Sequence, residues 1–139
     1  MKTVTIEVRK TIAVPPEMLW ATIARGTGVH DWFAVITSCR VEGNQRFCTM
    51  EGGGALQETL LGTDNATRTF RYSVDKHPLP WGPVQCVMQV MEAGMGKSEI
   101  VWQARLDCAS DIEAQARQML TGLYGQGIDA LEAYHQHVM

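Results

Sequence analysis

Polar and apolar residues alternate along the first segment of the chain, residues 3–14. Val4, Ile6 and Val8 fall on one side of an extended backbone, and polar residues fall on the other. This period of two predicts a half-buried β-strand. The proline pair at 15–16 ends the strand, because proline cannot donate to a strand ladder and is tolerated in the first turn of a helix.

Two short helical segments are expected after this strand. Residues 17–24 carry apolar side chains at helical spacing, and the Arg-Gly-Thr-Gly sequence at 25–28 breaks the helix. A second short helical piece is predicted at 29–33.

Six further strands follow from residue 35 onward. Strand-like runs, of which 67–75 is rich in aromatic and β-branched residues, are separated by short turns such as Glu42-Gly43-Asn44, which is the pattern of antiparallel hairpins. Residues 76–83 (KHPLPWGP) are expected to form a loop interrupted by prolines. The predicted strands are 35–41, 45–51, 55–62, 67–75, 84–92 and 98–108.

The apolar spacing changes to a helical period in the C-terminal part of the chain. Ser110 followed by Glu113 resembles a helix N-cap. Glycines at 122, 125 and 127 would each cost about 1 kcal/mol relative to alanine in an exposed helix. Either close packing against a sheet or ligand compensates for them, or the helix kinks there. The apolar positions are Ile112, Ala116, Met119, Leu120, Leu123, Tyr124, Ile128, Leu131 and Tyr134.

These elements predict an α+β fold in one domain, residues 1–139. A seven-stranded antiparallel sheet must bury one face, and the long C-terminal helix is the only element large enough to cover it. A strongly curved sheet need not close tightly on the helix along its whole length. The remaining gap would be an apolar cavity suited to a small molecule.

Composition excludes several classes of function. With 45% hydrophobic and 19% charged residues, the 139-residue chain can form a packed core. Its twelve Lys and Arg are scattered and its net charge is −3, so no basic surface for nucleic acid is expected. No apolar stretch approaches the ~20 residues of a membrane span, and no signal-peptide pattern is present. The sequence indicates a soluble, cytoplasmic protein without a cofactor.

The four cysteines are Cys39, Cys48, Cys86 and Cys108, and no two of them have the close spacing of zinc ligands. Two disulfides are formally available, but reduced thiols are expected in the absence of a secretion signal. The thiols are then interpreted as small buried apolar side chains, and no metal site is predicted.

Several short motifs punctuate the predicted elements. They are Ile12-Ala13-Val14-Pro15-Pro16-Glu17-Met18-Leu19-Trp20, His30-Asp31-Trp32-Phe33, Val41-Glu42-Gly43 with Arg46, Leu56-Gln57-Glu58 with Leu60-Leu61, Pro78-Leu79-Pro80, Val101-Trp102, and Leu123-Tyr124 with Gly127 and Leu131.

This set of motifs, in this order of elements, resembles the SRPBCC superfamily of START-type lipid-transfer domains, pollen-allergen-like proteins and polyketide cyclases. The resemblance covers essentially the whole chain, and the small bacterial polyketide cyclase/dehydrase-like branch is the most similar. It implies a helix-grip fold, in which a seven-stranded curved antiparallel sheet wraps around a long C-terminal helix, with two short helices after the first strand. It specifies the fold more sharply than the function.

Alternation along each strand assigns one face to the expected cavity. Most inward residues there would be plain core, and those near the open end would touch a ligand. The candidate ligand-binding residues are Arg46, Cys48, Met50, Glu58, Leu60, Tyr72, Cys86, Met88, Trp102, Leu120, Leu123 and Tyr124.

Arg46 and Glu58 stand out because both are ionisable and both fall on the inward face. Two such residues on adjacent strands can pair, since an isolated buried charge would be very costly. Three interpretations stay open: an internal ion pair that fixes strand register, a pair that orients a polar ligand group, and a catalytic pair. In the catalytic interpretation Glu58 is a general base and Arg46 stabilises an enolate.

Two functions are compatible with these residues. The first is binding of a small hydrophobic molecule (a lipid, an aromatic or a polyketide-like compound) in the internal cavity. The second is a polyketide cyclase or dehydratase that uses Glu58 and Arg46 for proton transfer. For partners the sequence indicates a small hydrophobic ligand and leaves room for a homodimer. Trp81, expected to be exposed between prolines, would suit a gate or a contact surface.

Overall fold

The computed structural model describes the backbone of residues 1–137 and the side chains of residues 1–136. The predicted order of elements is confirmed. The elements are β1 (Lys2–Ile12), α1 (Pro16–Ala24), the 3-10 turn η1 (Val29–Asp31), β2 (Ile36–Glu42), β3 (Gln45–Met50), β4 (Ala55–Asp64), β5 (Thr69–Lys76), β6 (Val84–Glu92), β7 (Ser98–Cys108), the 3-10 turn η2 (Ser110–Ile112) and α2 (Glu113–His137).

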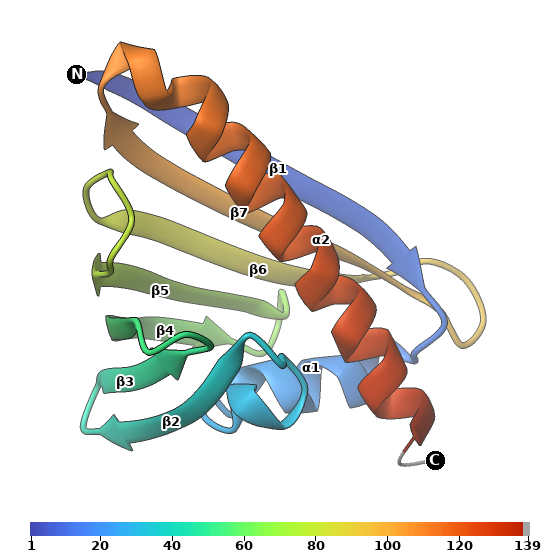
Figure 1. Ribbon diagram of the computed structural model, residues 1–139. Coiled ribbons are helices and arrows are strands. Elements are labelled where there is room, and N and C mark those ends of the chain that lie inside the picture. Colours follow the sequence, from blue (N-terminus) through green and yellow to red (C-terminus); the bar gives the residue numbers. More distant parts are fainter. Residues whose placement is uncertain (138–139) are drawn as a thin grey trace.

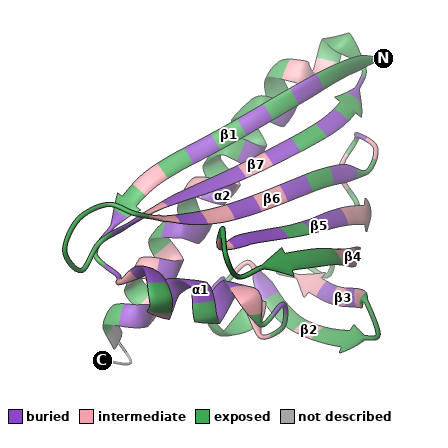
Figure 2. Cartoon of the chain, turned by 180° about the vertical axis from the view of Figure 1, so that it is seen from behind, coloured by how far each residue is buried: buried purple, intermediate pink, exposed green. Residues whose placement is uncertain are grey.

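The seven strands form one antiparallel sheet in the order β1-β7-β6-β5-β4-β3-β2. The sheet curves, and α2 runs diagonally across one of its faces (Figure 1). Buried and exposed residues alternate along β1, β7 and β6, so one face points toward the helix and the other toward solvent (Figure 2). This is the helix-grip arrangement, an α+β fold, as predicted.

The two short helices pack against different parts of the molecule: α1 contacts β6 and α2, and η1 contacts β2. Pro16 occupies the first turn of α1, where its missing N–H is not needed. Leu19 and Ile23 on α1 are buried, and the indole Nε1 of Trp20 donates a hydrogen bond to Oδ1 of Asn65 on the sheet side. Gly28, with φ of 74°, precedes η1, which lies against β2.

The start of the long helix differs from the sequence expectation. The residue before η2 is Ala109, in an extended conformation, and no side chain caps the turn, so the predicted Ser110 cap is wrong. The chain enters through the 3-10 turn, in which the N–H of Ile112 donates to the carbonyl of Ala109 and replaces the cap. No helix within residues 1–137 has the length and apolarity needed to cross a membrane.

The glycines do not break the long helix, which is continuous from Glu113 to His137. At Gly127 the reason is close packing against β7. A Cβ placed there would lie 2.6 Å from Cζ3 of Trp102 and 3.4 Å from Cζ of Phe33. At Gly122, by contrast, a Cβ would meet no atom within 4 Å. Only Gly127 is therefore required by the contact between the helix and the sheet.

The substitution Gly127→Ala is expected to lower the free energy of unfolding by about 1–3 kcal/mol, because the rigid Trp102 ring must shift to make room. Gly122→Ala is the matched control on the same helix. It should raise the free energy of unfolding by about 0.5–1 kcal/mol through helix propensity. Urea denaturation of both variants measures the difference, and equal stabilisation by both would contradict the packing argument.

Candidate binding cavity

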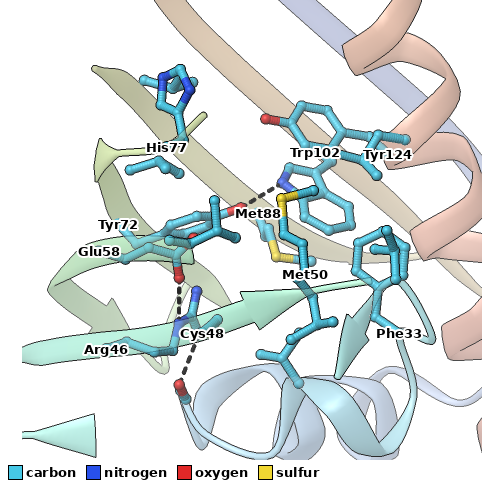
Figure 3. A pocket seen from close by; sticks show the side chains of 18 of the residues that line it. Phe33, Arg46, Cys48, Met50, Glu58, Tyr72, His77, Met88, Trp102 and Tyr124 are labelled. Atoms are coloured by element: carbon cyan, nitrogen blue, oxygen red, sulfur yellow. Dashed lines mark hydrogen bonds and ion pairs between the residues drawn. The ribbon is translucent and has the colours of Figure 1, made fainter. Parts of the chain in front are cut away.

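A cavity of about 100 Å³ lies between the inner face of the sheet, the α1–η1 region and α2. Its walls are mostly apolar and aromatic side chains, and Figure 3 shows them converging from strands and helix alike. Such a volume is smaller than the roughly 300–1,000 Å³ of drug-sized sites and closer to the ~150 Å³ cavity that admits a benzene ring. The side chains of the sheet and of α2 thus leave part of the space between them unfilled.

Ten of the twelve candidate ligand-binding residues line this cavity. The other two, Leu60 and Cys86, do not: Leu60 packs beside Gly26, and the Cys86 thiol is buried next to the Tyr124 hydroxyl. The lining candidates are Arg46, Cys48, Met50, Glu58, Tyr72, Met88, Trp102, Leu120, Leu123 and Tyr124. The alternation of inward and outward residues along the strands was therefore sufficient to identify most of the cavity-lining residues that the sheet provides.

Two further groups of lining residues had no part in the sequence-based selection. One comes from α1, η1 and the residues around them, where elements are too short for a period to fix the inward face. The other comes from the loop before β6. The composition of this loop predicts a turn but does not indicate which of its side chains point into the cavity. These residues are Thr22, Ile23, Gly26, Thr27, Val29, Trp32, Phe33, Val35, Ile36, His77, Leu79 and Trp81.

The expectation of an exposed Trp81 is wrong. Its side chain lines the cavity and is buried, 8% exposed. The prolines fold the loop back over the end of the sheet, and the ring nitrogens of His77 hold it there. The Nδ1 atom accepts from the N–H of Leu79 at 3.1 Å and Nε2 donates to the carbonyl of Gly82 at 2.9 Å. The loop is a wall of the cavity.

Arg46 and Glu58 are both 5% exposed and form a direct ion pair, opposite each other on β3 and β4. Arg46 Nε donates to Glu58 Oε1 at 2.6 Å, and its Nη1 donates to the carbonyl of Gly26 at 2.7 Å (Figure 3). Burial raises the pKa of the Glu58 carboxyl, and the charge and hydrogen bond of Arg46 oppose this shift without cancelling it. The pair is the one buried ion pair among the described residues.

The guanidinium of Arg46 also stacks on the aromatic wall. Its Cζ lies 5.1 Å from the ring centroid of Tyr72 and 5.8 Å from that of Phe70. These cation–π contacts fix the direction of the side chain as well as its charge. The Arg46 guanidinium therefore contacts a carboxylate, a backbone carbonyl and two aromatic rings.

The aromatic wall continues from Tyr72 to Trp102 and Tyr124, and the polar atoms of these side chains have partners within the protein. Trp102 and Tyr124 stack with ring centroids 4.5 Å apart, and Trp102 Nε1 donates to the hydroxyl of Tyr72 at 3.0 Å. The Tyr124 hydroxyl lies 3.7 Å from Sγ of Cys86. Burial raises the pKa of Cys86 to about 12 and the pKa values of both tyrosines well above the ordinary value, so this wall stays neutral.

The expectation of four reduced thiols is also wrong, since Cys39 and Cys48 form a disulfide between β2 and β3. The two-residue turn at 43–44 places them directly opposite each other, with Cα atoms 4.2 Å apart. That separation is typical of antiparallel pairs that do not exchange backbone hydrogen bonds. Cys86 and Cys108 remain free and buried. The disulfide ties the edge strand to the wall of the cavity, because Cys48 is a lining residue.

His135 holds the end of α2 against α1. Its side chain is 5% exposed, and Nε2 lies 2.9 Å from the hydroxyl of Thr22, itself a lining residue. Burial and, to a lesser extent, the charge of Arg25 lower the pKa of His135. Among residues 1–136, no three side chains of His, Cys, Asp or Glu come together in a way that could hold a metal ion.

Solved structures with the same fold are numerous. One is a protein from Bacillus thuringiensis with a TM-score of 0.88 and 22% identity, covering 94% of this chain and 97% of its own. Another is the protein XoxI from Bacillus cereus, with a TM-score of 0.85 and 24% identity, covering 96% and 94%. A third, from Thermobifida fusca, has a TM-score of 0.83 and 20% identity, covering 95% and 93%. At these identities the likeness concerns the fold.

A comparison with curated proteins finds no significant match. A comparison with protein families finds one that matches residues 3–136, described as polyketide cyclase / dehydrase and lipid transport. The match agrees with the curved sheet, the long helix and the cavity between them. The chain therefore belongs to the polyketide cyclase / dehydrase and lipid transport family.

Proposed function

We propose that this protein binds a small hydrophobic molecule in the cavity between the sheet and α2. The observation that carries the proposal is the cavity itself: about 100 Å³ with largely apolar and aromatic walls and one charged pair. Apolar walls supply affinity by removing ligand surface from water, and a few polar groups set orientation. The family description, which includes lipid transport, supports the same interpretation. The candidate ligands are a lipid, an aromatic or a polyketide-like compound, and the volume favours a compact one.

Native mass spectrometry of gently purified protein tests this proposal. A noncovalent apolar compound should be retained, or bound when small aromatic compounds are added. The substitution Val74→Phe places extra carbon atoms in the cavity wall and should reduce binding at least roughly tenfold. Val41→Phe is the matched control, since Val41 is 38% exposed and not a lining residue. Equal binding by the two variants would argue against the cavity as the site.

A second function, proton transfer of the cyclase or dehydratase type, is favoured by one observation. The Glu58 carboxyl lies beside a ligand-sized space, and its raised pKa brings it closer to the range of a general base. The substitution Glu58→Gln separates the two functions. An enzyme should lose turnover while keeping ligand affinity, whereas a carrier should show a changed affinity and no turnover in either form.

A further inference from the structure

The polar atoms of the cavity are distributed unevenly. The hydroxyl of Tyr72 accepts from Trp102, and that of Tyr124 lies against Cys86. Both ring nitrogens of His77 are bonded to backbone groups of the loop. The hydroxyl of Thr22 is bonded to His135. These groups already have hydrogen-bond partners within the protein, so a hydrogen bond from a ligand to one of them would add little binding free energy.

Two groups are different. The indole Nε1 of Trp81, another lining residue, is buried and has no hydrogen-bond partner among the described residues, and the contacts of the ion pair use only part of its hydrogen-bonding capacity. Arg46 uses Nε and Nη1, and Glu58 uses Oε1. These contacts leave a guanidinium Nη2, which can only donate, and a carboxylate Oε2, which can accept. Both residues are lining residues, and Figure 3 shows them together at one end of the cavity. The end of the cavity at the ion pair thus offers one donor and one acceptor from residues that are in direct contact.

The charge balance at this end restricts what can bind. The pair is already neutral as a whole, and no other cationic side chain lines the cavity in the described residues. An anionic ligand group would place a second negative charge next to the Glu58 carboxylate without a new partner, at a high cost in a buried site. A neutral hydroxyl can instead donate to Oε2 and accept from Nη2 at the same time, and both hydrogen bonds are charge-assisted.

The volume restricts the ligand further. A cavity of about 100 Å³ is on the scale of a single aromatic ring. The stacked rings of Trp102 and Tyr124 and the ring of Phe33 provide flat apolar surfaces for such a ring. Size, ring surfaces and the position of the ion pair therefore describe a small ring with one polar end.

We infer that the ligand is an uncharged one-ring compound whose hydroxyl group bridges Arg46 Nη2 and Glu58 Oε2. The inference rests on the proposed binding function and deepens it, because it names the chemical class of the ligand. It assigns Arg46 and Glu58 together the role of a specificity determinant that selects a hydroxyl over both a hydrogen and a carboxylate.

Three probes of similar size test the inference on the unaltered protein: phenol, toluene and benzoate at neutral pH. Phenol should bind roughly tenfold more tightly than toluene, by the two hydrogen bonds to charged groups. Benzoate should bind at least about tenfold more weakly than phenol. Titration calorimetry or NMR chemical shifts give the three dissociation constants.

The outcomes separate this inference from the proposed function. Equal binding of phenol and toluene, or tighter binding of benzoate, would overturn the hydroxyl inference and leave the cavity as a binding site. Absence of binding by all three probes would overturn both. The double variant Arg46→Met/Glu58→Leu adds a check, since it should abolish the preference for phenol over toluene while toluene still binds; a retained preference would overturn the inference.

Discussion

Replacing Glu58 with leucine is expected to lower the free energy of unfolding by about 3–5 kcal/mol, because it leaves the Arg46 charge buried without a partner. For a chain of this length that loss corresponds to a fall in Tm of roughly 10–15 °C. Arginine cannot escape the cost by releasing its proton. Thermal and urea denaturation of the variant at neutral pH measure the effect.

The reverse substitution, Arg46→Met, should have a cost that depends on pH. Without the guanidinium, burial raises the folded-state pKa of Glu58 further above its ordinary value of 4.5. The variant should therefore match the unaltered protein most nearly below the pKa of the unfolded carboxyl. Its deficit should appear as the pH rises through the folded-state pKa. A deficit that grows toward acid pH would contradict the assigned sign.

Two controls accompany these variants. In the double variant Arg46→Met/Glu58→Leu most of the lost stability should return, since neither charge is left unpaired. The substitution Glu99→Gln breaks the exposed pair with Arg9 and should cost less than about 1 kcal/mol. A double variant as unstable as Glu58→Leu would mean that the pair itself, rather than the unpaired charge, provides the stability.

Reduction of the Cys39–Cys48 disulfide should lower the free energy of unfolding by about 2–3 kcal/mol. The bond closes a short loop, with a sequence separation of 9, and restricts the unfolded chain accordingly. Denaturation with and without a dithiol reductant measures the difference. A reducing compartment such as the cytosol would open the bond, so its presence in the cell depends on location.

A thiol count checks the pairing directly. The unreduced protein, once denatured, should show two reactive thiols, from Cys86 and Cys108, and the reduced protein four. The variant Cys39→Ala/Cys48→Ala should lose the dependence of its stability on reductant, whereas Cys108→Ala should keep it. Four reactive thiols before reduction would show that the bond does not form.

The sequence was sufficient for the elements and for the side of the sheet that faces inward. Period-two alternation predicted all seven strands, and it placed Arg46 and Glu58 inside although both are charged. The reason is that a one-residue error in facing would have exposed every apolar residue of the strand. The partnership of the two residues was an open interpretation, and the structure shows it as a direct contact.

Other features depended on geometry that the pattern does not contain. Trp81 was expected outside because prolines and a tryptophan in a loop carry no facing information, and the fold of the loop brings it inside. The disulfide could have been found from the turn, since a two-residue hairpin loop at 43–44 places residue 39 opposite residue 48. The volume of the cavity follows from the packing of about two dozen side chains, and alternation along single strands does not determine it.

Three of the four tryptophans, Trp32, Trp81 and Trp102, line the cavity, while Trp20 is bonded to Asn65 away from it. The protein consequently carries its own optical reporter. A bound compound would change the environment of three indole rings at once. The wavelength or intensity of the tryptophan fluorescence should therefore change when a ligand binds. The substitution Trp20→Phe would remove the one tryptophan whose fluorescence should not respond to a ligand, so the change on binding would be a larger fraction of the total emission.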